Sequence, residues 1–158
     1  NDDISEWDIA RVTTLRSAFN AASVFNGDLS RWDASSVTTL YCVFCFASAF
    51  NGDVSAWDVS NVVNMQATFI YAVRFNSDVS TWDASGVTQM ESMFNGASSF
   101  NSDVSAWDVS RVTDMSYMFM YAIRSRLMTP LLHSYSSNVD INAKARKMVG
   151  QKSFGSKI

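Results

Sequence analysis

Proline and glycine are scarce in this 158-residue sequence, with one proline and six glycines. This scarcity excludes a collagen-like chain and a flexible linker. No run approaches the roughly 20 apolar residues of a membrane-spanning helix. With one histidine, His133, and two cysteines, the sequence holds few of the residue types that build catalytic or metal centres. The chain begins at Asn1 without a secretory signal, which we interpret as a processed product or a fragment, with an organelle as its expected location.

What is present is globular in composition, 47% hydrophobic and 13% aromatic, and its length suits one domain. Charge divides the chain in two. Residues 1–124 hold 14 acidic and 6 basic side chains, whereas residues 125–158 hold one acidic side chain and six basic ones. We therefore predict a repeat body over 1–124 and a C-terminal cap with a basic, extended arm over 125–158.

A period of 25 residues runs through the body without an insertion, giving five repeats. We call residues that lie 25 positions apart a column. The tryptophan column and one aspartate column are predicted to form a structural ladder: Trp7, Trp32, Trp57, Trp82 and Trp107, with Asp28, Asp53, Asp78 and Asp103. A fixed period of this length predicts stacked units, none of which buries its apolar face alone.

Within one repeat the apolar spacing changes. Val62, Met65, Phe69 and Ala72 are spaced 3, 4 and 3, which favours a short helix, and the residues around Trp57 alternate as in a short strand. The expected fold is therefore an α/β solenoid of five strand–helix repeats, with the phenylalanine, tryptophan and methionine columns in its core.

The aspartate and asparagine columns have two interpretations. Repeated carboxylates can bind calcium, but Asp and Asn also bond neighbouring main chain at bends. We favour the second, because the glycine-rich turns of calcium-binding repeats are absent.

The unit from Phe100 to Ala122, with its F-N-x-D and W-D segments, resembles the repeat of the BspA-like proteins over residues 1–124. The resemblance implies a leucine-rich-repeat-like, non-catalytic solenoid, and it supplies no catalytic residue. That family is abundant on bacterial surfaces and occurs in some algae, so the resemblance also suggests a cell-surface recognition module. Residues 125–158 have no counterpart in the motif.

Cys42 and Cys45 form the only C-x-x-C pair. A zinc site needs about four ligands, so these two cysteines alone do not form one. We expect two unpaired thiols, which favours a reducing compartment, with a labile disulfide as the alternative. We predict no cofactor, no metal and no enzymatic activity. An acidic body also disfavours nucleic acid.

Positions that vary between repeats are where a stacked array places binding specificity. They include Arg16, Arg31, Tyr41, Tyr71, Arg74, Glu91, Tyr117 and Tyr121. In the tail, the candidate partner-binding residues are Arg126, Lys144, Arg146, Lys147, Lys152, Phe154 and Lys157.

These features lead to three hypotheses. The first is a protein–protein interaction scaffold, an accessory subunit docked in a larger assembly through its arm and body. If the source is an alga, that assembly could be a photosystem or another plastid membrane complex, with the chain peripheral to the membrane. The second is a cell-surface adhesin, and the third is a metal-binding module built on the Asp columns or on Cys42 and Cys45.

Overall fold

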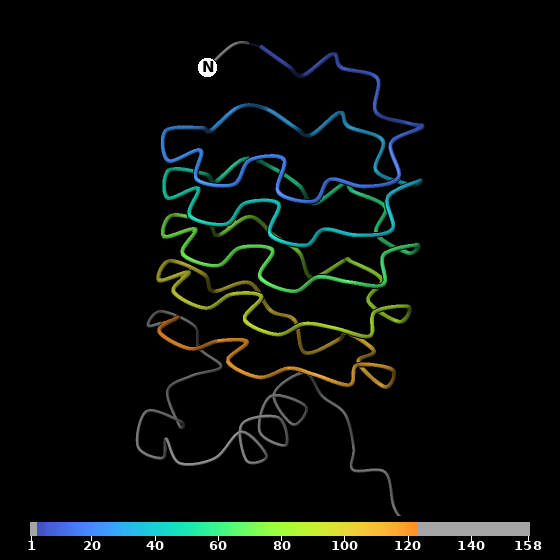
Figure 1. Ribbon diagram of the computed structural model, residues 1–158, viewed down its shortest axis with the longest axis vertical. Helices are drawn as coiled ribbons and strands as arrows, with labels where there is room; N and C mark the ends of the chain where they lie inside the picture. The colour runs from blue at the N-terminus through green and yellow to red at the C-terminus, as the bar shows by residue number, and fades with distance from the viewer. Residues whose placement is uncertain (1–2, 123–158) are drawn as a thin grey trace, which may run out of the picture.

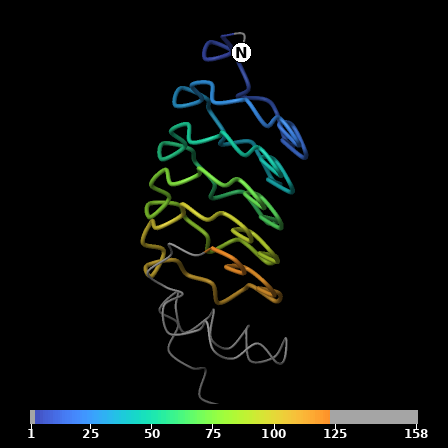
Figure 2. The same ribbon diagram turned by 90° about the vertical axis from the view of Figure 1, so that its left-hand side faces the viewer.

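A computed structural model of the chain describes residues 3–122. Over this range the chain winds into flat coils of 25 residues, stacked one on another along the long axis (Figure 1). Seen edge-on, successive coils lie parallel (Figure 2). The only sheet-like pairing in the described range is one isolated parallel bridge between each pair of neighbouring coils, from Thr14–Thr39 to Gln89–Asp114.

Each coil consists largely of consecutive turns in which a main-chain N–H donates to the carbonyl three residues back. In the second coil such turns join Leu29 to Trp32, Ala34 to Val37 and Ala47 to Phe50. Residues 15–22 and the equivalent segments of the later coils each contain three more turns of this kind. In the first four coils, this segment also bonds to the next coil. Coil formation therefore uses local hydrogen bonds that a single repeat can make by itself.

Main-chain donors alternate in direction along that segment. The N–H groups of Leu15, Ser17, Phe19 and Ala21 donate to carbonyls of the second coil at 2.7–3.3 Å. The N–H groups between them, at Ala18, Asn20 and Ala22, donate three residues back at 3.0–3.1 Å. Alternate donors thus bond within the coil and between coils, so the segment satisfies its donors without a helix or an extended strand.

The predicted α/β, leucine-rich-repeat-like solenoid of strand–helix repeats is therefore wrong. Residues 3–122 contain no helix and no extended strand. Packed helices lie 8–10 Å apart, whereas the equivalent rings Phe44 and Phe69 of successive coils are 5.5 Å apart. A helix in every coil would not fit that spacing. The 3, 4, 3 apolar pattern arises instead from overlapping turns, which also bury Val43 and Met93.

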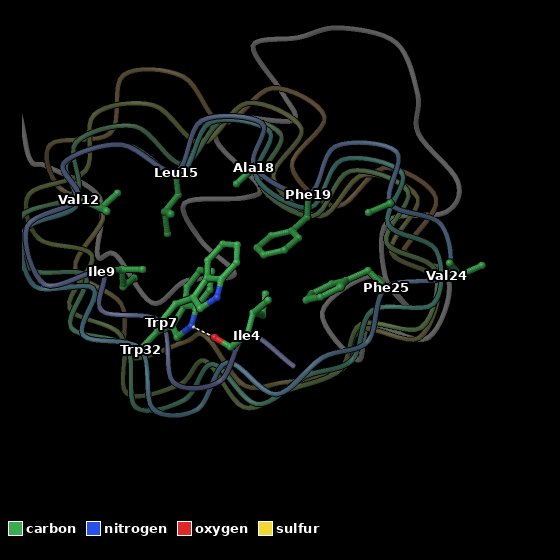
Figure 3. A pocket seen from close by; sticks show the side chains of 11 residues that line it. Ile4, Trp7, Ile9, Val12, Leu15, Ala18, Phe19, Val24, Phe25 and Trp32 are labelled. Atoms are coloured by element: carbon green, nitrogen blue, oxygen red, sulfur yellow. Dashed lines mark hydrogen bonds between the residues drawn. The ribbon is translucent and has the colours of Figure 1, made fainter. Parts of the chain in front are cut away.

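The core lies between the two long sides of the coil. As predicted, the phenylalanine and methionine columns are buried, with Phe69, Phe94, Met65 and Met90 inaccessible to solvent. Each indole N–H from Trp32 onward donates at 3.0 Å to a carbonyl of the preceding coil. Figure 3 shows the first of these bonds, from Trp32 to Ile4. The tryptophan rings stack in parallel at 6.2–6.5 Å, so the columns join coils by both packing and hydrogen bonds.

Candidate interaction surface

Two columns of left-handed residues run along the stack. All ten have φ between 54° and 72°. The first column is Ser17, Cys42, Ala67, Ser92 and Tyr117. The second, which we call the edge column, is Ala21, Phe46, Tyr71, Gly96 and Tyr121. This conformation follows from the alternation of donors, because a right-handed residue at each of these positions would continue the local turns as a helix.

A left-handed conformation costs a non-glycine residue about 1–2 kcal/mol. Glycine adopts it without that cost, and asparagine is the next most tolerant residue. The edge column uses glycine once, at Gly96, and places aromatic residues at Phe46, Tyr71 and Tyr121. The backbone does not favour aromatics there, so folding alone does not explain them.

These aromatic side chains are also exposed. Phe46 is 52% exposed, Tyr71 39% and Tyr121 53%. The Phe46 and Tyr71 rings stack nearly parallel at 5.2 Å. Gly96 makes room for this stack, since a Cβ on it would lie 2.4 Å from Cδ1 of Tyr71. We call Phe46, Tyr71 and Tyr121, with the exposed Val73 two residues after Tyr71, the aromatic edge.

The aromatic edge is chemically suited to binding. Flat, half-exposed rings offer apolar area at low cost in side-chain entropy, which is why aromatics concentrate at protein interfaces. Its four members are uncharged, two of them tyrosines whose hydroxyl groups can also donate or accept hydrogen bonds. The rest of the described range is acidic, with 13 acidic and 5 basic side chains.

Other variable positions mostly join neighbouring coils. The guanidinium of Arg16 lies 4.2 Å from the centre of the Tyr41 ring. The Gln66 amide donates to the Glu91 carboxylate at 2.6 Å, and Arg31 forms an ion pair with Glu6. Arg74 is exposed and Tyr117 half-buried. Of the variable positions that we identified, Tyr71 and Tyr121 belong to the aromatic edge.

Sequence reasoning missed Phe46. The signal lay in its column, which combines the small residues Ala21 and Gly96 with three aromatic residues. The candidate residues Arg126, Lys144, Arg146, Lys147, Lys152, Phe154 and Lys157 lie outside the described residues, as does the predicted arm.

The aspartate columns bond main chain at the bends. Asp28 Oδ1 accepts from the N–H of Ser30 at 2.9 Å, and Asp58 Oδ1 accepts from that of Ser60 at 3.0 Å. The bond from the Ser30 main chain, and then that from its hydroxyl, lowers the pKa of Asp28. For Asp58 the hydroxyl of Ser60 is the larger cause of a lowered pKa. These carboxylates therefore stay ionised at neutral pH.

The asparagine column links one coil to the next. The main-chain N–H of Asn51, Asn76 and Asn101 each donates at 2.7 Å to the side-chain Oδ1 of the asparagine 25 residues earlier. Asn51 and Asn76 thus each bond to the coil before them through the main-chain N–H and to the coil after them through Oδ1. Among residues 3–122 no three or more His, Cys, Asp or Glu side chains gather as a metal site.

The expectation of two free thiols is wrong, because Cys42 and Cys45 form a disulfide with a Cα–Cα distance of 4.8 Å. With no free thiols among the described residues, the structure gives no reason to expect a reducing compartment. The disulfide closes a four-residue turn that the third coil closes with a main-chain bond alone, from Ile70 to Ala67. The fold does not need this bridge, and so short a loop gains the least chain entropy from one.

A family model described as "Mycoplasma protein of unknown function, DUF285" matches residues 1–82 and 47–153. No curated protein and no solved structure matches the chain. Residues 3–122 contain no helix that could cross a membrane.

Proposed function

The chain belongs to the DUF285 family, and we propose that it is a non-catalytic scaffold that binds another protein through the aromatic edge. The observation that carries the proposal is the placement of Phe46, Tyr71 and Tyr121 at left-handed, solvent-exposed positions. Each side chain adds backbone strain and leaves apolar area in water. A binding role accounts for both costs.

The partner's chemistry follows from the surroundings of the edge. A complementary surface would bring an apolar or planar group to the rings and lysine or arginine at its rim, facing the acidic body. We propose that this partner is a subunit of a larger assembly. The basic residues after Arg124 would be a second contact in that assembly.

The resemblance of the repeat to that of the BspA-like proteins favours a variant of the same role, which is recognition at a cell surface. Both versions use the stack to present side chains and neither requires catalysis. The identity of the protein that co-purifies with the native chain separates them: an assembly subunit supports the first version, and a matrix or host-surface protein supports the second.

The test compares a triple variant, Phe46→Gly, Tyr71→Gly and Tyr121→Gly, with the control Val63→Thr. Val63 is an exposed apolar residue in a column otherwise made of threonine, away from the edge. The triple variant should keep its circular dichroism spectrum and lose the protein that the wild type and the control both retain on native co-purification. If all three chains retain that protein, the aromatic edge is not the binding surface.

A further inference from the structure

The Cys42–Cys45 disulfide spans a turn that the other four coils make without one. The equivalent residue pairs are Ser17 with Asn20, Ala67 with Ile70, Ser92 with Asn95, and Tyr117 with Met120. In each pair the N–H of the second residue donates to the carbonyl of the first at 3.0–3.2 Å. The N–H of Cys45 makes the same bond to the carbonyl of Cys42 at 3.3 Å. The main-chain turn therefore closes with or without a bond between the two sulfurs.

Neighbouring coils and the core also hold both cysteines independently of the bridge. The N–H of Cys42 donates to a carbonyl of the third coil at 3.1 Å, and the carbonyl of Cys45 accepts from the first coil at 2.7 Å. Val43 and Phe44, the two residues within the turn, are inaccessible to solvent. Breaking the bond between the sulfurs should therefore leave the two Cα atoms near their distance of 4.8 Å, which is suitable for forming the bridge again.

The two cysteines differ in their access to solvent. Cys45 is 1% exposed and Cys42 is half-buried, so Cys42 is the one that an incoming thiolate can reach. Sγ of Cys45 lies 3.2 Å from the main-chain carbonyl oxygen of Ala67. A thiol at this position can donate a hydrogen bond to that oxygen. The reduced form of Cys45 therefore has a polar partner in the core without any rearrangement of the coils.

We infer that the Cys42–Cys45 disulfide is a reversible redox site, which a dithiol reduces through Cys42 while the stack stays folded. A thiolate of the dithiol attacks Sγ of Cys42, and Sγ of Cys45 leaves with the electron pair and takes up the proton that the attacking thiol released. The second thiolate of the dithiol then attacks the sulfur bonded to Cys42, and Cys42 leaves and takes up the second proton. The chain gains two electrons and two protons, and the dithiol becomes a disulfide. No atom of the aromatic edge takes part.

The first experiment treats the full chain with dithiothreitol at neutral pH, with and without urea, removes the reagent and counts the thiols with a chromogenic thiol reagent. Both samples should give two thiols per chain, the number of cysteines in the sequence. The sample without urea should keep its circular dichroism spectrum and a single cooperative unfolding transition, and oxidised dithiothreitol should restore the bridge. Thiols that appear only in urea would overturn the inference, and so would loss of the folded spectrum on reduction.

A matched pair of variants, Cys45→Ser and Cys42→Ser, tests which sulfur is attacked. Serine already occupies the position of Cys42 in two other coils, as Ser17 and Ser92. The Cys42 thiol left in Cys45→Ser should form a mixed disulfide with glutathione disulfide at least about tenfold faster than the Cys45 thiol left in Cys42→Ser, and urea should remove the difference. Equal rates in the folded variants would overturn the role of Cys42. If either variant does not fold, limited alkylation of the reduced wild type and peptide mapping make the same comparison, and the label should lie on Cys42.

Discussion

Replacing Gly96 with alanine should destabilise the stack through two separable effects. Alanine at φ +72° incurs strain of about 1–2 kcal/mol, which is partly offset by about 0.4–1 kcal/mol of reduced freedom in the unfolded chain. The new Cβ would also lie 2.4 Å from the Tyr71 ring, so the ring must leave its stack on Phe46, a loss of about 0.5–1.5 kcal/mol. We expect Gly96→Ala to lower the free energy of unfolding by about 1–2.5 kcal/mol.

The second effect should vanish when Tyr71 is absent. Urea unfolding of wild type, Gly96→Ala, Tyr71→Ser and the double variant forms a double-mutant cycle. In the Tyr71→Ser background, Gly96→Ala should cost only the net strain, about 0.5–1 kcal/mol. Equal losses in both backgrounds would refute the contact between Gly96 and Tyr71. A gain in stability from Gly96→Ala would refute the left-handed conformation itself.

Three further predictions concern the core, a buried polar atom and the aspartate columns. Phe69→Ala should lower the free energy of unfolding by about 3–5 kcal/mol, because the ring is fully buried between those of Phe44 and Phe94. A loss under about 1 kcal/mol in urea titration would contradict this packing. Asn95→Ile should raise that free energy by about 1–2 kcal/mol, since Oδ1 of Asn95 is buried without a hydrogen-bond partner, and an unchanged thermal midpoint would count against it. Hydrogen bonds from Ser55 lower the pKa of Asp53 from its ordinary value of 3.8. Protonation breaks these bonds, which exist only in the folded state, so the free energy of unfolding should fall as pH drops below about 3.8. In Asp53→Asn this fall should be smaller.

The period and the core could be predicted from the sequence because both depend on residue identity alone. Columns of phenylalanine and methionine at 25-residue spacing can only be buried by stacking, whatever the local backbone conformation. Phe50, Phe75 and Phe100 are accordingly inaccessible to solvent. The prediction of the core held even though the predicted secondary structure did not.

The backbone path could not be predicted from apolar spacing. Positions 62, 65, 69 and 72 have the spacing of a helix face, but overlapping turns with left-handed residues at Ala67 and Tyr71 place the same positions inward. Glycine usually marks left-handed positions, and here it marks only Gly96. The aromatic edge was hidden for the same reason, since Phe46 reads as a helix residue until its φ is known.

The uniform coil length gives the molecule a mechanical unit. The ring centres of successive tryptophans from Trp32 onward lie 6.2–6.5 Å apart, whereas 25 extended residues span about 80–90 Å. When the stack is pulled from its ends, each coil that peels away would extend to more than ten times that spacing. Because no coil carries an insertion, every such step would have the same length, and a tether built from these coils would yield in equal increments.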